Sequence, residues 1–128
     1  MEIRFLIEPS IAAMAAIRAD ETDIKNILTA CENTEKLLLA NKNHAEKDIA
    51  FHTAIALSSK NIVVPKLVPI INSSIPLIRE SAKLTMRDET IEIHREIADA
   101  IAAHDAVRAH DAMYLHLIYN RKHIKSIN

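Results

Sequence analysis

The sequence predicts an all-α fold of about six helices in one domain. Glycine is absent from the 128 residues, whereas strand-rich folds need glycine at hairpins and bulges. Apolar residues recur at helical spacing in most segments, which is the pattern of helices that bury one face. No internal repeat or linker is visible, so we expect residues 1–128 to form a single domain.

Three helices are expected in the first half of the chain. Pro9 either starts the first helix or kinks its first half, because proline removes an interior hydrogen bond. The acidic run at 20–23 is typical of a helix N-terminus. Residues 41–43, Asn-Lys-Asn, form a short polar connection in which an Asn is the expected C-terminal cap, since the chain lacks glycine. The predicted helices cover about residues 3–19, 24–40 and 44–58.

In the second half of the chain, helical spacing of apolar residues is clear only from residue 87 onward. Residues 62–83 are rich in β-branched side chains and contain Pro65, Pro69 and Pro76. Either a kinked helix or a strand pair could hold them, and we favour the helix because proline is excluded from central strands. Clean helical spacing resumes at residue 87 and breaks near residue 104, and Asp105 is a plausible cap for the last helix.

Composition limits the classes of function. The formal net charge is −1, so no basic field favours nucleic acid or an anionic membrane. The single cysteine, Cys31, cannot form an internal disulfide and is expected to be a small core residue. We find no signal peptide and no apolar run of membrane-spanning length. We therefore expect a soluble cytoplasmic domain.

Four residues form a candidate metal site. Asp48 and His52 are four residues apart, so both project from one face of a helix. His94 and His116 each lie inside an apolar helical stripe, where a neutral imidazole needs a partner. Three imidazoles and one carboxylate suit Zn²⁺, or Ni, Mn or Fe. On spacing alone, a surface ion pair plus two core histidines is the favoured interpretation.

Two arginines are candidates for binding an acid. Arg4 and Arg79 lie in mainly apolar sequence, and a guanidinium beside a metal could pair bidentately with a carboxylate. His110 precedes His116 by six residues, about 240° around a helix, so the two cannot face one site. The remaining histidines, His44, His104 and His123, are expected to be solvated or paired locally.

The chain resembles the FadR C-terminal domain (FCD) family, the effector-binding halves of GntR-type bacterial transcription regulators. The D-x-x-F-H…N signature of that family is matched by residues 48–52 and by Asn61. Its closing motifs are matched around residues 92–105 and 113–117, and its first helix by residues 4–8 and 15–16. One departure is that Ile93 separates Glu92 from His94, where the family has Glu and His adjacent.

The resemblance implies an antiparallel bundle of six to seven helices. It gives the metal-ligand roles to Asp48, His52, His94 and His116, and it implies a small organic acid beside or on the metal. Asn61 would either contact that effector or terminate a helix. The family also implies a homodimer that reads DNA only through a winged helix-turn-helix domain, which is absent from these 128 residues.

Two other classes of function compete with this interpretation. An open metal site could activate water in an enzyme that acts on a small acid, although no general base is evident beyond the ligands. A metal-free structural helical module is the other rival. We expect a sensor domain and not an enzyme, either as an excised fragment or as a stand-alone domain.

Overall fold

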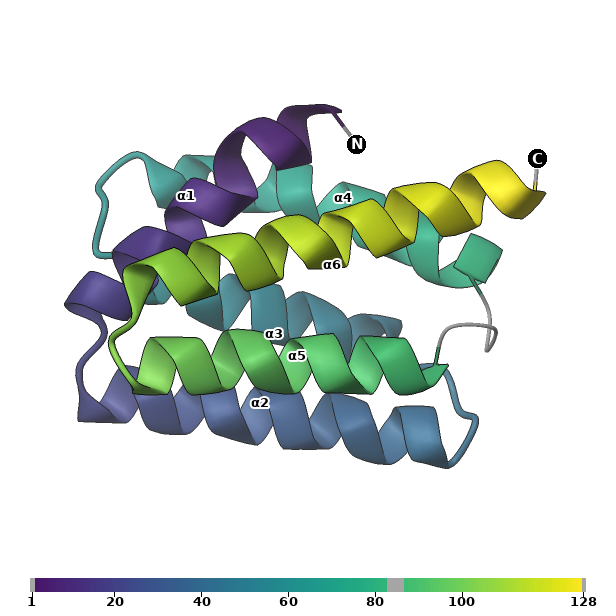
Figure 1. The fold of residues 1–128 in the computed structure, drawn as a ribbon, viewed down its shortest axis with the longest axis horizontal. Helices are drawn as coiled ribbons and strands as arrows, with labels where there is room; N and C mark the ends of the chain where they lie inside the picture. The colour runs from purple at the N-terminus through teal and green to yellow at the C-terminus, as the bar shows by residue number, and fades with distance from the viewer. Residues whose placement is uncertain (1, 83–86, 128) are drawn as a thin grey trace.

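Six helices make up the part of the chain that the structure describes (Figure 1). The computed structural model describes residues 2–82 and 87–127, with side chains described for 2–73 and 87–122. Strand is absent from these ranges, so the all-α prediction is confirmed and the strand pair considered for residues 62–83 is wrong. The helices are α1 (Glu2–Arg18), α2 (Glu21–Leu39), α3 (Ala45–Ser58), α4 (Val64–Ala82), α5 (Arg87–Ala102) and α6 (Ala106–Ile127).

The helices pack as a bundle in which α5 lies between α2 and α6 and runs opposite to both (Figure 1). α1 packs against α6, α3 and α5, while α3 also packs against α2 and α4. As a result α3, α5 and α6 each present one face to the same interior. In the described part of the chain, no helix is long and apolar enough to cross a membrane.

Prolines lie inside two helices without ending them. α1 continues through Pro9, so the alternative in which the helix starts there is wrong. Pro65 stands in the first turn of α4, as expected, and the helix continues through Pro69 and Pro76. Each interior proline costs about 3 kcal/mol in an isolated helix. Packing of α1 and α4 against neighbouring helices offsets this cost.

Polar residues close the turns of this glycine-free chain. Asp20 and Asp23 form a capping box at the start of α2, and the Asp105 side chain accepts a hydrogen bond from the Arg108 backbone N–H at the start of α6. Asn41 follows α2 with φ 57°, as predicted for a C-terminal cap. The other left-handed residues in the described ranges are Lys60 and His104, both at φ 56°.

Candidate metal centre

Asp48, His52, His94 and His116 converge from three helices inside the bundle. α3 carries Asp48 and His52, α5 carries His94 and α6 carries His116. None of the four residues is more than 3% exposed. One ring nitrogen from each histidine lies within 4.8 Å of those of the other two. The alternative of a surface ion pair is therefore wrong, because Asp48 and His52 are fully enclosed.

The distances to Asp48 fit a shared cation. Its Oδ1 atom lies 3.5 Å from Nε2 of His52 and 3.6 Å from Nε2 of His94. These separations exceed the 2.7–3.2 Å of an N–H···O hydrogen bond. Two ligand atoms at ~2.1 Å from a tetrahedral zinc ion are about 3.4 Å apart. Asp48 thus fits a shared cation with His52 and His94 in spacing, and the donor types of all four residues suit a divalent first-row metal.

The imidazole rings are held by one another and by an aromatic neighbour. The His52 and His116 rings stack with centroids 5.4 Å apart, and the His94 and His116 rings meet edge-on at 4.9 Å. Phe51 is fully buried and lies 4.9 Å from the His94 ring. This packing limits rotation of the rings and excludes water from one side of the cluster.

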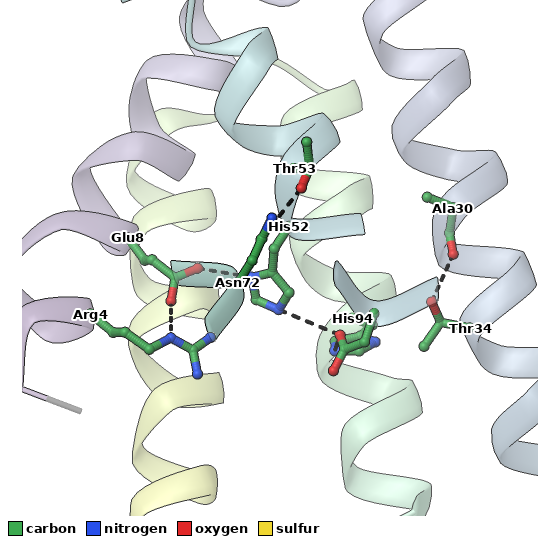
Figure 2. A network of polar contacts seen from close by, with 9 residues as sticks. Arg4, Glu8, Ala30, Thr34, His52, Thr53, Asn72 and His94 are labelled. Atoms are coloured by element: carbon green, nitrogen blue, oxygen red, sulfur yellow. Dashed lines mark hydrogen bonds and ion pairs between the residues drawn. The ribbon is translucent and has the colours of Figure 1, made fainter. Parts of the chain in front are cut away.

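Glu8 is a site residue that the search of the sequence for ligands did not select. Its Oε1 atom lies 2.8 Å from Nδ1 of His52, and its Oε2 atom accepts a hydrogen bond from Nε of Arg4 at 2.5 Å. Figure 2 shows Glu8 linked to both Arg4 and His52. All three residues are at most 3% exposed. The polar network of the site therefore extends from α3 to α1.

The network favours charged forms. Burial alone would raise the pKa of Glu8, but His52 and Arg4 outweigh it and hold that pKa below its ordinary value. Burial alone would lower the pKa of His52, but Glu8 and Asp48 outweigh it and raise that pKa. The ion pair with Arg4 thus favours the carboxylate form of Glu8, which can only accept hydrogen bonds.

Arg4 is a buried cation beside Glu8. The residue is 1% exposed, and only its Nε atom donates to Glu8. Its two terminal nitrogens, Nη1 and Nη2, are buried without a hydrogen-bond partner among the described residues. Buried guanidinium N–H groups are costly when unsatisfied, and they form the face that binds a carboxylate bidentately.

The other predicted effector residues are not brought into this cluster by any described contact. Asn61 accepts a hydrogen bond from the Val63 backbone N–H just before α4, and its Nδ2 lies 3.8 Å from Sδ of Met14. This placement matches its alternative structural role at a helix end. The Arg79 side chain lies outside the described residues.

Of the remaining histidines, His104 and His110 pair locally, as expected. Nδ1 of His110 lies 3.0 Å from its exposed neighbour Asp111. His104 binds the Ala16 backbone carbonyl through Nδ1 at 2.9 Å. His44 is buried at the N-cap of α3 and is not solvated. The His123 side chain falls outside the described residues.

A surface groove along α5 and α6 is distinct from the histidine cluster. It has a volume of about 750 Å³ and is lined by residues that include Asp88, Glu92, Arg95 and Tyr119. None of the four candidate ligands lines it. The groove has a mainly acidic rim, which is unsuited to holding a carboxylate.

Comparison with known proteins points to one family. The model of the FCD domain matches residues 1–118. The HTH-type transcriptional regulator YcbG of Bacillus subtilis is 29% identical over 124 residues, covering 97% of this chain and 52% of that protein. The galactonate operon transcriptional repressor of Escherichia coli is 33% identical over 113 residues, covering 81% of this chain and 47% of that protein. An Escherichia coli protein named as a regulator of the L-lactate dehydrogenase operon is 34% identical over 126 residues, covering 93% and 48%.

A solved structure supports the same assignment. The structure titled Streptococcus agalactiae GntR superposes with a TM-score of 0.82 at 34% identity, covering 94% of this chain and 56% of that one. The chain thus spans about half the length of the relatives and of the solved chain that it matches. These relatives are named as transcriptional regulators, which indicates a regulatory and not an enzymatic domain. The chain belongs to the FCD domain family of GntR-type transcription regulators.

Proposed function

We propose that this domain senses a small hydroxycarboxylate at a divalent metal, with Zn²⁺ as the expected ion. Asp48, His52, His94 and His116 would hold the metal, which would supply a Lewis-acidic centre for the acid. The observation that carries the proposal is the convergence of three buried imidazoles and one buried carboxylate from three helices. Neutral imidazoles and a carboxylate are donors that a divalent first-row metal prefers.

Arg4 supports a carboxylate as the second ligand. Its Nη1 and Nη2 atoms are buried without described partners, and it is joined to His52 through Glu8. A carboxylate between Arg4 and the metal would satisfy both terminal nitrogens. A hydroxyl next to that carboxylate would add a second oxygen for chelation.

The names of the relatives agree with this class of effector. One is named for the galactonate operon and another for the L-lactate dehydrogenase operon, and galactonate and lactate are both hydroxycarboxylates. We therefore infer a small hydroxy acid for this domain as well. Asn61 and Arg79 remain weaker candidates for contacting it.

The output would be a shift between helix arrangements. An acid that binds one arrangement more tightly would favour it by the difference in binding free energy. In a cytoplasmic homodimer, that arrangement would set the spacing of winged helix-turn-helix domains in the full-length regulator. The present residues would act on DNA only through those domains.

Substitution of the ligands tests the metal site. We expect His52→Ala and His116→Ala to lose stoichiometric zinc and to lower the melting temperature, because bound metal stabilises the folded state. Elemental analysis of protein purified without a histidine tag measures the zinc. His110→Ala, a half-buried histidine on the same helix as His116, is the matched control and should retain zinc. Full zinc content in both site variants would refute the proposed ligands.

An acid panel tests the effector. We expect lactate or galactonate to raise the melting temperature of the zinc-loaded protein by several degrees, and acetate to raise it less because acetate has no hydroxyl to chelate. The shift should vanish after treatment with EDTA and in Arg4→Gln. Equal stabilisation with and without metal would show that the acid does not bind at the metal.

A further inference from the structure

We propose that Glu8 is a positioning residue for the metal centre, which fixes the tautomer and orientation of His52. The proposal rests on the metal site proposed above and concerns a residue of α1, the one helix of the network that supplies no ligand. Glu8 contacts His52 at the ring nitrogen opposite the one that faces Asp48. It therefore acts through His52 and does not itself bind the metal.

The geometry determines which nitrogen carries the proton. Oε2 of Glu8 accepts a hydrogen bond from the Arg4 guanidinium, and a carboxylate in such an ion pair can only accept. The 2.8 Å contact between Oε1 and Nδ1 of His52 therefore requires a proton on Nδ1. In the neutral ring the lone pair is then on Nε2, and this is the atom that lies 3.5 Å from Oδ1 of Asp48. The lone pair is directed at the cluster.

Arg4 holds Glu8 in place for this task. The Nε–H of Arg4 donates to Oε2 of Glu8 one turn away on α1, so the carboxylate cannot rotate without losing one of its two contacts. Glu8 is 3% exposed, and water therefore does not compete for its oxygens. The result is a chain of hydrogen bonds from Arg4 through Glu8 to His52 (Figure 2).

The chemical consequence is that His52 becomes a more basic metal ligand with a fixed ring orientation. A carboxylate that accepts the remote N–H of a metal-bound histidine fixes the ring and raises its basicity, and loss of such a partner typically costs about 10–100-fold in metal affinity. Because Glu8 lies on α1 and His52 on α3, their hydrogen bond also connects these two helices.

The test compares two double variants that both lack the buried charges. In the Arg4→Met background, Glu8→Gln keeps an oxygen acceptor for His52, whereas Glu8→Leu removes it. The probe is Zn²⁺ alone, and its affinity is measured by competition with a chromophoric chelator. We expect R4M/E8L to bind Zn²⁺ about 10–100-fold more weakly than R4M/E8Q. Affinities within threefold of each other would overturn the proposal.

A spectroscopic measurement keeps the proposal testable should R4M/E8L fail to fold. Long-range ¹H–¹⁵N NMR of the wild-type zinc complex should show His52 bound through Nε2, with a slowly exchanging proton on Nδ1. Coordination through Nδ1 would overturn the proposal. If the wild-type protein binds no zinc, both this inference and the proposed function fall, whereas normal binding with the wrong tautomer removes this inference alone.

Discussion

Arg4 and Glu8 form an ion pair one turn apart on α1, with only 1% and 4% of their side chains exposed. Both charges lose their hydration on folding, and that loss is offset only where the partners are well placed. Glu8 has partners on both oxygens, whereas Arg4 has a described partner at Nε alone. The Arg4–Glu8 pair therefore lowers the free energy of unfolding relative to apolar residues at these positions, as expected of residues that serve a binding site.

Removal of one member of the pair should be more costly than removal of both. We expect Arg4→Met to lower the free energy of unfolding of the metal-free protein by about 3 kcal/mol, because it leaves Glu8 with a single partner in the interior. R4M/E8L should recover most of this loss, since apolar side chains replace both charges. Urea unfolding followed by circular dichroism measures each value.

Arg108→Met is the matched control for this prediction. Its guanidinium pairs with Glu96 at 2.7 Å, but both side chains are about 40% exposed, and exposed pairs contribute little. We expect almost no change in the urea midpoint for this variant. A loss as large as that of Arg4→Met would mean that burial does not set the cost.

The sequence singled out the four residues of the buried cluster, but it did not single out Glu8, which contacts one of them. Asp48 and His52 share a helical face by spacing, and His94 and His116 stand out as polar residues inside apolar stripes. Glu8 is less visible, because the apolar residues Ile3, Leu6 and Ile17 suggest another face of α1, yet all three are exposed. The Arg4–Glu8 spacing of four was the available signal. Only the packing of α1 against α3 and α6 reveals which face is buried.

At the scale of the element, the start of α2 is stabilised by two carboxylates. The Asp20 side chain accepts a hydrogen bond from the backbone N–H of Asp23 at 2.8 Å, and the Asp23 side chain accepts one from the backbone N–H of Asp20 at 3.0 Å. Asp23 also lies 2.6 Å from Nζ of Lys60, in the turn between α3 and α4. One side chain thus both caps a helix and ties it to a distant turn.

The contribution of Asp23 should depend on pH. Burial would raise the pKa of Asp23, but Lys60 and the Asp20 backbone N–H outweigh it and lower that pKa. A carboxyl whose pKa is lower in the folded state contributes stability above its unfolded value, and the contribution is lost as pH falls through the folded pKa. Asp23→Asn should therefore destabilise by about 1 kcal/mol at pH 7 and by less at pH 3. Melting temperatures across this range measure the effect.

Glu32→Gln provides the comparison for this pH series. Glu32 is an exposed carboxyl in the middle of the same helix. Its melting curve should follow that of the wild type at every pH. A constant deficit for Asp23→Asn from pH 7 to pH 3 would contradict the proposed linkage.

The presence of each helix was predictable from the local sequence pattern, but whether α1 continues through Pro9 was not. The Asp20 and Asn41 caps were visible in the sequence because they satisfy backbone groups of their own helix. Whether Pro9 ends α1 depends on how firmly the helix is held by neighbours that are distant in sequence. That information lies in the tertiary packing, and a single chain does not display it.

At the scale of the whole molecule, the candidate site is enclosed by the bundle. Its residues come from α1, α3, α5 and α6, and each of them is nearly inaccessible to solvent. A metal in this position could leave only when helices separate. Local opening of this kind is governed by the stability of the surrounding elements.

Removal of zinc should therefore be limited by the protein and not by the chelator. We expect the rate of zinc loss to become independent of EDTA concentration once EDTA is in large excess, because helix opening then limits the process. Stopped-flow measurements with a zinc-sensitive dye follow the loss. A rate that rises in proportion to EDTA at every concentration would indicate direct access to the ion.

The same enclosure bears on what the domain reports to the cell. An ion that is released only during rare openings stays in place through brief changes in supply, so occupancy follows average metal levels over long periods. A small acid entering and leaving more often would then be the variable that changes from minute to minute. In the proposed regulator the metal would be a permanent part of the binding site, and the small acid would be the signal to which the regulator responds.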